Sequence, residues 1–358
     1  MPHSLSTALT QLLGIALPII QGPMNGASTP EMVVAVSNAG GLGSLAAASL
    51  SPNAIRAQAA TIRSRTSKPF SINLFVLDTP APSEDEVRSA LDRLQPIRAD
   101  LGLPPGQPLE RYCEDFGEQL EALIELKVPV ASFTFGLLDA LSVQRLHDAG
   151  SLVIGTATSV AEARAWEVSG ADIICAQGAE SGGHRGTFLG HPDASMIGTL
   201  ALVPQIVDAI SRPVIAAGGI MDGRGVAAAL VLGAQAAQLG TAFLTTAESP
   251  IHPAWKERIR QSTDTSTRTS RAFTGRPARG IVNDYIRRMA EFEQDVPPYP
   301  IQNALTTEMR KAAGAANRPD FISLWAGQAA GLSRRRDDGI PAATLVRALA
   351  DETASAFG

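Results

Sequence analysis

The feature that most constrains the fold is an alternation of short apolar runs with segments of helical periodicity. Most of the runs are apolar throughout rather than at every second residue, which is typical of parallel strands buried on both faces. The predicted strands are Pro18–Met24, Gly41–Ala46, Phe70–Val76, Val128–Phe135, Leu152–Ala157, Ala171–Gln177, Pro213–Ile220 and Ala236–Phe243.

The segments between these strands predict helices, and several begin at Ser, Thr, Asp or Pro and stop at Gly, as helix termini prefer. One βα unit repeated eight times predicts an α/β fold, the (β/α)8 TIM barrel. A doubly wound open sheet has the same alternation, but no GxGxxG pattern follows the first strand, so the barrel is favoured. The predicted helices are Pro30–Asn38, Pro52–Arg65, Leu137–Asp148, Ser159–Ser169, Thr199–Ile210 and Asp222–Leu232.

Two stretches do not fit the repeat. The acidic, proline-bearing segment 78–112 is an insertion after the third strand, and the end of the chain holds more helical pattern than a closing barrel helix needs. Insertions after barrel strands emerge at the catalytic face. We therefore expect residues 1–244 to form the barrel domain, and residues 245–358 to form a helical cap that packs on its mouth.

Charge and cysteine content exclude several classes of protein. The formal charge of −5 is spread along the chain without a Lys/Arg run, so nucleic acid is not an expected partner. Cys113 and Cys175 form no CxxC pattern, and no His or carboxylate spacing indicates a metal site. No signal peptide and no membrane-spanning run is present. These features predict a cytoplasmic protein that binds neither membranes nor metal.

Glycine-rich turns follow the last two predicted strands. "AAGGIMDGRG" (216–225) follows the seventh strand just before a helix, and "QLGTAF" (238–243) lies in the eighth. Paired turns at these places form the usual phosphate site of barrel enzymes, because backbone N–H groups can approach the phosphate oxygens there. The alternative reading is two tight turns without a ligand.

Further residues at the predicted barrel mouth indicate a flat, phosphorylated cofactor. "QGPMNG" places Met24 after a turn stiffened by Pro23, and the amides Asn73 and Gln177 end the third and sixth strands. Each amide alone is explained by a hydrogen bond to backbone. Together with a phosphate site they favour FMN, although a phosphosugar barrel without flavin remains open.

The sixth strand continues into "AQGAESGGHRG" (176–186), a glycine-rich loop with one imidazole. Such a loop lets the backbone pass close to a planar ring and leaves His184 as the functional side chain. An imidazole there can take a proton from carbon or hold an anionic substrate. Glu180 is expected to orient the loop or balance charge, and Arg185 to turn outward or pair with an acid. The plainer alternative for His184 is a turn cap, and the four other histidines are weaker candidates.

Five blocks together resemble the class I nitronate monooxygenases, formerly called 2-nitropropane dioxygenases. The resemblance spans about residues 13–332 and implies an enzyme with non-covalent FMN. Such enzymes oxidise alkyl nitronates, including propionate 3-nitronate, with O2 through a flavosemiquinone, and release nitrite or nitrate and a carbonyl product. The matching blocks are "QGPMNGASTPEMVVAVSNAGGLGSL", "AQGAESGGHRGTF", "AAGGIMDGRG", "QLGTAF" and "WAGQAAGL".

The resemblance also implies roles for single residues. His184 would be the catalytic residue, and Gln328 would reach the cofactor from the cap. With the two glycine turns included, the predicted cofactor-binding residues are Pro23, Met24, Asn73, Gln177, Gly182, Gly183, Ala217, Gly218, Gly219, Gln238, Leu239, Gly240, Thr241 and Gln328.

The predicted substrate pocket contains Tyr112, Tyr299 and Asn303, and it departs from the family pattern. Asn303 and Thr307 stand where the family carries a tyrosine and a lysine, so the pocket is expected to lack a phenol and a cation for an anionic substrate. Lys311, one turn beyond Thr307, is a substitute cation or a solvated helix lysine.

Two other functions remain open. An NAD(P)H-dependent flavin reductase, acting on quinones or enoyl thioesters, would use the same barrel, and a flavin- or phosphate-binding protein without turnover would share the two turns. The expected partners are a small nitronate or nitroalkane and O2, with the protein a monomer or homodimer.

Overall fold

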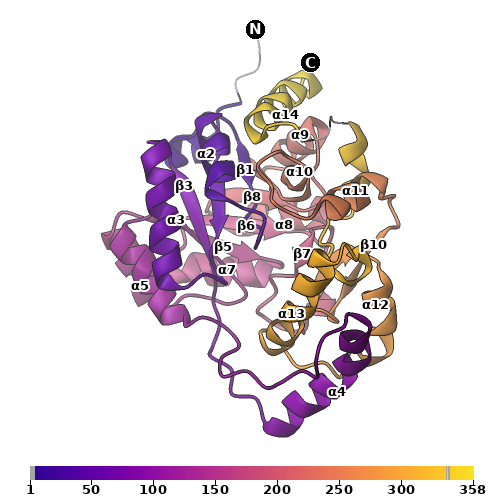
Figure 1. Ribbon diagram of the computed structural model, residues 1–358. Coiled ribbons are helices and arrows are strands. Elements are labelled where there is room, and N and C mark those ends of the chain that lie inside the picture. The colour runs from indigo at the N-terminus through magenta and orange to yellow at the C-terminus, as the bar shows by residue number, and fades with distance from the viewer. Residues whose placement is uncertain (1–4, 336, 338) are drawn as a thin grey trace.

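The computed structural model describes residues 5–335, 337 and 339–358 and confirms the barrel (Figure 1). Eight parallel strands form one sheet, and each lies within its predicted range. In chain order the barrel strands are β1 (Ile19–Gln21), β2 (Gly43–Ala46), β3 (Phe70–Phe75), β4 (Val130–Thr134), β5 (Leu152–Ala157), β6 (Ile173–Gln177), β8 (Val214–Ala217) and β9 (Ala236–Leu239).

The sheet closes on itself between its first two strands. The paired order runs β1-β9-β8-β6-β5-β4-β3-β2. The Gln21 N–H donates to the Leu42 carbonyl at 2.9 Å, and the Leu42 N–H donates to the Ile19 carbonyl at 3.0 Å. These bonds join β1 to the segment that enters β2, so the barrel is nearly closed and leaves no long open edge.

Helices cover the outside of the barrel, and side chains cap most of their first turns. Thr29, Ser51, Asp139, Ser159 and Asp222 each accept a backbone N–H near the start of the helix they precede, as favourable N-caps do. The outer helices are α2 (Pro30–Asn38), α3 (Pro52–Arg65), α5 (Phe116–Leu126), α6 (Ala140–Asp148), α7 (Val160–Ser169), α8 (Thr199–Ala209) and α9 (Gly223–Val231).

The barrel interior is apolar at its N-terminal end. Inward-facing side chains of the strands, such as Ile154, Ile173 and Ile215, form one buried cluster with Leu9 and Leu13 of helix α1 (Ala8–Leu13). Helix α1 therefore plugs the end of the barrel away from the glycine turns, and any ligand site must lie at the other end. None of the described helices is long and apolar enough to cross a membrane.

The predicted eighth strand is too long. It ends at Leu239, and Thr241–Leu244 form the short helix α10 instead. Gly240 leaves extended geometry, with φ −104° and ψ −71°, and the apolar side chains that suggested a strand are buried in the helix. A short apolar run does not by itself separate a buried strand from a buried helix.

The cap lies over the barrel mouth and combines the two irregular stretches. Helix α4 (Glu84–Asp100) of the insertion packs beside α13 (Ile301–Ala315), as Figure 1 shows, and both contribute to one hydrophobic core. The remaining cap helices are α11 (Pro253–Gln261), α12 (Asp284–Arg288), and the 3-10 turns η2 (Ala290–Phe292), η3 (Pro319–Phe321) and η4 (Ala330–Arg335); η1 (Pro192–Ser195) lies between β7 and α8.

A small antiparallel sheet in the cap was not expected from the sequence. Strands β10 (Thr267–Ser270) and β11 (Ala278–Ile281) form a hairpin, and β11 also pairs with β7 (Gly183–His184) from the loop after β6. The cap is therefore mainly helical but touches the barrel loops through a sheet.

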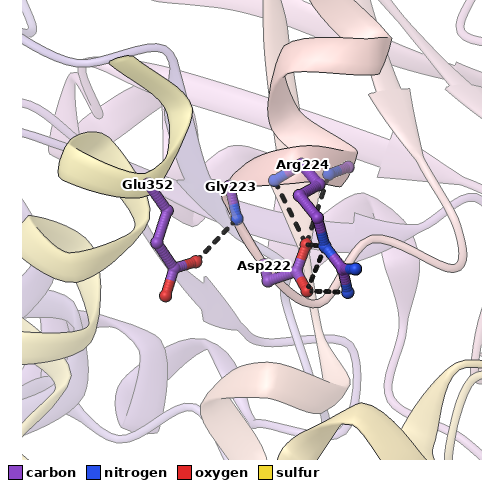
Figure 2. Close-up of polar contacts among 5 residues, drawn as sticks. Asp222, Gly223, Arg224 and Glu352 are labelled. Atoms are coloured by element: carbon purple, nitrogen blue, oxygen red, sulfur yellow. Dashed lines mark hydrogen bonds and ion pairs between the residues drawn. The ribbon is translucent and has the colours of Figure 1, made fainter. Parts of the chain in front are cut away.

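The last helix, α14 (Ala342–Ala356), belongs to the segment that was expected to form the cap over the barrel mouth. It packs instead on the outside of the barrel. Its buried residues Leu345, Val346 and Leu349 belong to the core of the barrel, where α14 packs against α9 and α2. Figure 2 shows the polar part of this contact, in which the Glu352 carboxylate accepts the Gly223 N–H at 2.8 Å.

Candidate active site

A cavity of about 260 Å³ lies at the C-terminal ends of the barrel strands, under the cap. Its position is where barrel enzymes hold their active sites. It brings together most of the site residues predicted from the sequence: Pro23, Met24, Asn73, Gln177, Gly182, Gly183, His184, Ala217, Gly218, Gly219, Gln238, Gly240, Thr241, Tyr299 and Asn303.

Three predicted residues do not line this cavity. Leu239 is fully buried in the barrel core. The side chain of Gln328 is exposed, and its backbone N–H donates to the Glu180 carbonyl at 2.9 Å, so this residue anchors the cap to the β6 loop. Tyr112 lines a second pocket formed within the insertion.

The two glycine turns lie side by side at the cavity and offer unpaired donors. Backbone N–H groups of Gly218, Gly219, Gly240 and Thr241 have no acceptor within the described part of the chain. Gly218 and Gly219 have φ values of +123° and +71°, which favour glycine. A Cβ on Gly218 would lie 2.8 Å from the Ser181 and Thr199 hydroxyls. Unsatisfied N–H groups gathered at a cavity form a site for an anion.

The helix after the first glycine turn does not add donors to this site. Glu352 accepts the Gly223 N–H of α9, and Asp222 accepts the Arg224 N–H, as Figure 2 shows. The Asp222 carboxylate also accepts the Gly225 N–H. The first turn of α9 is therefore satisfied from within the protein, and the loop at Gly218 and Gly219 supplies the free groups.

The loop from β6 to His184 is held in place by half-buried polar side chains. Glu180 accepts the Thr199 N–H at 2.9 Å and the Thr199 hydroxyl at 2.8 Å. These bonds orient the loop, which is one of the two roles expected for Glu180 from the sequence. Gln177 uses both ends of its amide within the loop: Nε2 donates to the His184 carbonyl, and Oε1 accepts the Gly186 N–H. This amide is therefore committed to the protein backbone.

The expectation for Arg185 was wrong. Its side chain is buried, with 5% exposure, and donates to the backbone carbonyls of Gln177, Thr158 and Ser195 instead of turning outward or pairing with an acid. Burial lowers the pKa of Arg185 to about 10, so the guanidinium stays charged near neutral pH. Arg185 fixes the shape of the loop from beneath.

Position 182 requires glycine for a steric reason that the sequence alone did not indicate. A Cβ at this position would lie 2.5 Å from the Gly327 nitrogen of the cap. The Gly327 N–H donates in turn to the Thr241 hydroxyl at 2.9 Å. Close approach of the cap backbone therefore requires glycine at position 182, and the contact ties the β6 loop to the turn after β9.

Asn73 faces the cavity from β3. Its Nδ2 donates to Ser132, while Oδ1 has no partner among the described residues and is accessible at the cavity. Asn73 therefore presents one hydrogen-bond acceptor to a ligand.

His184 stands on β7, where its backbone pairs with Ala278 of β11, and its ring projects into an aromatic part of the cavity. The ring centroids of Tyr299, Phe135 and Trp325 lie 5.3, 5.5 and 5.7 Å from the imidazole. Burial, with the nearby charges of Arg276 and Arg310, lowers the pKa of His184 to about 3. The imidazole is therefore neutral at ordinary pH.

Thr274 determines which nitrogen of His184 carries the proton. The Thr274 Oγ1 lies 3.0 Å from His184 Nε2 and 3.2 Å from the carbonyl oxygen of Arg276. A hydroxyl has one hydrogen, and the carbonyl can only accept. All three groups are satisfied when Thr274 donates to the carbonyl and accepts from Nε2–H. His184 Nδ1 then carries the lone pair, and it is open to the cavity without a partner in the described residues.

The pocket also holds a cation, contrary to the sequence-based expectation. Arg310 of α13 lines the cavity together with Tyr299 and Asn303. Lys311, the substitute considered from the sequence, is exposed on the other side of the helix. Helical phase would have indicated Arg310, because it lies seven positions from Asn303 and on the same face. Thr274 and Arg276 carried no signal in the sequence pattern, and Trp325 was noted only as the first residue of the block "WAGQAAGL".

The other histidines lie away from the cavity. His147 Nε2 lies 2.9 Å from the Asp172 carboxylate, His252 caps α11, and His191 caps the turn η1. His3 lies outside the described residues. Within the described residues, His184 is thus the imidazole at this site.

Comparisons with known proteins show which family the chain belongs to. The sequence model of the family described as nitronate monooxygenase matches residues 6–352. A probable nitronate monooxygenase from Staphylococcus aureus (strain JH9) is 44% identical over 323 residues, which cover 89% of this chain and 90% of the relative.

Two solved structures are similar to this chain over nearly its whole length. A nitroalkane oxidase from Streptomyces ansochromogenes is similar with a TM-score of 0.89 and 40% identity, covering 98% of this chain and 99% of that one. FabK from Thermotoga maritima follows with a TM-score of 0.76, 32% identity and coverage of 98% and 97%.

Fold and site together define a (β/α)8-barrel oxidoreductase with its cavity between the barrel mouth and a cap. The matches extend over nearly the whole chain, including the His184 loop and both glycine turns. The chain belongs to the nitronate monooxygenase family.

Proposed function

We propose that the protein binds FMN and oxidises alkyl nitronates, such as propionate 3-nitronate, with O2, giving a carbonyl compound and nitrite or nitrate. The proposal rests chiefly on one observation: a neutral imidazole opens onto the cavity that also contains the unpaired N–H groups of the glycine turns. A reactive side chain and an anion site within one cavity fit a phosphorylated cofactor that meets its substrate at His184.

The residues present fit FMN. The free N–H groups of Gly218, Gly219, Gly240 and Thr241 would hold its phosphate, and Asn73 Oδ1 would accept a hydrogen bond from its ring. When bound, the flavin supplies the ability to accept an electron from the nitronate and to pass it to O2. The protein supplies binding, orientation and protection from water.

His184 acts on the substrate through Nδ1 in this proposal. With a neutral nitroalkane, the Nδ1 lone pair accepts the proton from the carbon next to the nitro group, and the imidazolium then pairs with the nitronate formed. The low pKa of His184 in the free protein means that this lone pair is available at neutral pH. A nitronate supplied directly needs no base and uses the cavity for binding and orientation alone.

Replacement of His184 tests the proposal. We expect His184→Asn, loaded with FMN, to keep the flavin absorbance of the wild type and to lose at least about a hundredfold in turnover of a neutral nitroalkane, which needs the base. Oxygen consumption and nitrite release are the measurements, with exposed His191→Asn as the matched control. Full activity in His184→Asn would refute the assigned role.

A second measurement separates the proposed function from the reductase alternative. Without O2, propionate 3-nitronate is expected to change the flavin absorbance of the wild type, whereas NADH is not. Prompt bleaching by NADH with no response to nitronate would support the flavin reductase instead. A preparation without flavin absorbance would argue against both flavin-dependent functions.

A further inference from the structure

Strand β4 and the residue after it bring two consecutive side chains to the cavity. Within the strand the side chains alternate between its two faces. Ala131 and Phe133 pack in the core that joins the barrel to its outer helices, whereas Ser132 and Thr134 line the cavity. The same alternation would direct Phe135 toward the outer helices. Phe135 instead lines the cavity beside Thr134.

The backbone of Phe135 accounts for this reversal. Its φ is +81°, in the left-handed region that a residue with a bulky side chain rarely adopts. Among the described residues, Lys127 and Asn317 also have a positive φ without being glycine, but they follow the helices α5 and α13, where this conformation is usual. Phe135 follows a strand. Its conformation is therefore strained, and the surrounding side chains must hold it in place.

Three side chains pack against the Phe135 ring. The Arg276 Cζ lies 3.9 Å from the ring centroid, over its face. The ring centroids of Phe75 and Tyr299 lie 4.1 and 5.4 Å away. A guanidinium over an aromatic face is attracted to it, and more strongly when water is excluded. These contacts offset the strain in the backbone.

Arg276 supports the ring from outside the cavity. Its Nε donates to the Arg185 carbonyl at 3.0 Å, and its Nη2 donates to the Thr187 carbonyl. Phe135 lines the cavity and Arg276 does not, so the ring stands between the guanidinium and the space for a ligand. The guanidinium is fixed by the loop after β6, and it fixes the ring in turn.

The Phe135 ring limits the space beside the proposed base. Its centroid lies 5.5 Å from that of the His184 imidazole, at an interplanar angle of 86°, and Phe135 is only 6% exposed. Phe75 and Tyr299 pack around the same imidazole, with centroids 6.2 and 5.3 Å away. Because these rings are packed against one another, this part of the cavity widens only if a buried side chain moves.

We propose that Phe135 is a specificity-determining residue that limits the size of the substrate at His184. Its ring favours nitronates with a short, unbranched carbon chain and disfavours those that carry a ring close to the reacting carbon. The left-handed backbone at position 135 places the ring in the cavity instead of among the outer helices. This inference rests on the proposed function and adds to it the residue that selects substrates by bulk.

The test compares the nitronates of nitroethane and of 2-phenylnitroethane. Phe135→Ala leaves a space similar in size to the phenyl group of the larger substrate. We expect the wild type to favour the smaller nitronate, and Phe135→Ala to shift the ratio of the two kcat/KM values toward the larger one by at least about tenfold.

The matched control is Phe133→Ala. It removes a fully buried ring from the same strand, but from the face turned to the outer helices. We expect this variant to keep the wild-type ratio. An unchanged ratio in Phe135→Ala, or the same shift in Phe133→Ala, would overturn the inference.

Phe135→Gly tests the role of the backbone and guards against poor folding of the alanine variant. Glycine adopts a positive φ without strain, so Phe135→Gly should unfold at a higher urea concentration than Phe135→Ala while showing the same shift in substrate ratio. Circular dichroism gives the two midpoints. A midpoint of Phe135→Gly at or below that of Phe135→Ala would overturn the left-handed placement of the ring.

A binding measurement separates this inference from the proposed function. Trp255 and Trp325 line the cavity, so 2-phenylnitroethane that binds there should quench tryptophan fluorescence. We expect Phe135→Ala to bind this neutral compound about tenfold more tightly than the wild type and Phe133→Ala do. If the FMN-loaded wild type oxidises neither nitronate, the proposed function fails, while this titration still supports or overturns the size limit at Phe135.

Discussion

At the scale of single residues, His184 is the neutral group that can accept a proton, and the positive charge near it is carried by Arg276 and Arg310. His184 is neutral because burial, followed by the repulsion of Arg276 and Arg310, lowers its pKa to about 3. A group with a lowered pKa stays unprotonated until the pH falls to that value. We therefore expect kcat/KM for a neutral nitroalkane to show no inflection near pH 6.5, where an ordinary histidine titrates.

Thr274 is a positioning residue in this arrangement, and its hydroxyl can be removed with little change of shape. Thr274→Val leaves His184 Nε2–H without an acceptor, so the tautomer with the proton on Nδ1 gains population. We expect turnover of neutral nitroalkanes to fall by about tenfold or more, because the lone pair no longer faces the substrate. Turnover of preformed nitronates should fall less.

Thr274→Ser is the matched control, since it keeps the hydroxyl and should restore nitroalkane turnover. The ¹⁵N chemical shifts of His184 report the tautomer directly, a signal that a merely structural role would not move. Wild-type tautomer and rates in Thr274→Val would contradict the assignment.

At the scale of elements, the proposed anion site consists of the loop after β8 and the turn that begins the short helix α10, and not of the first turn of α9. Asp222 and Glu352 satisfy the first turn of α9, which leaves the glycine turns after β8 and β9 as donors (Figure 2). Their geometry depends on residues without a Cβ. Gly218 combines a φ of +123° with contacts of 2.8 Å to two hydroxyls for any added Cβ.

Gly218→Ala tests this turn. The side chain must strain the backbone or displace Ser181 and Thr199, at a cost of about 1–2 kcal/mol. Because this cost falls on the loop that is proposed to hold the phosphate, we expect FMN to bind about tenfold more weakly. Gly190→Ala is the control: its φ of +76° is strained in the same way, but no atom lies within 4 Å of the added Cβ. Equal FMN affinity in both variants would argue against the cradle.

The barrel strands could be read from the sequence because burial on both faces leaves continuous apolar runs. The hairpin β10–β11 could not, since each strand has only four residues and neither is an apolar run, and β11 pairs with a two-residue strand more than ninety positions away. Such pairing leaves no local periodicity. Residues that line the cavity were predicted where glycine and histidine follow a strand, as at His184. It was missed at Arg310 and Thr274, whose importance comes from the packing of the cap over the mouth.

At the scale of the whole molecule, two hydrophobic cores have different tasks. One joins the barrel to its outer helices and to α14, and the other joins the insertion helix α4 to the cap helices. Arg98 of α4, which is 4% exposed, donates to Glu308 of α13 at 2.7 Å and links segments 210 positions apart. The insertion therefore supports the helix that carries Asn303 and Arg310.

A pair of matched leucines separates these two tasks. Leu94 in the cap core and Leu349 in the barrel core are both fully buried, so replacing either with Ala should lower the free energy of unfolding by about 2–5 kcal/mol. Only Leu94→Ala loosens the support of α13. We expect it to raise KM for propionate 3-nitronate severalfold at a temperature where both variants are folded, while Leu349→Ala keeps the wild-type KM. Urea denaturation followed by circular dichroism gives the stabilities, and initial rates give KM. Equal KM values for the two variants would mean that α4 does not hold the cavity-lining residues of α13, Asn303 and Arg310, in position.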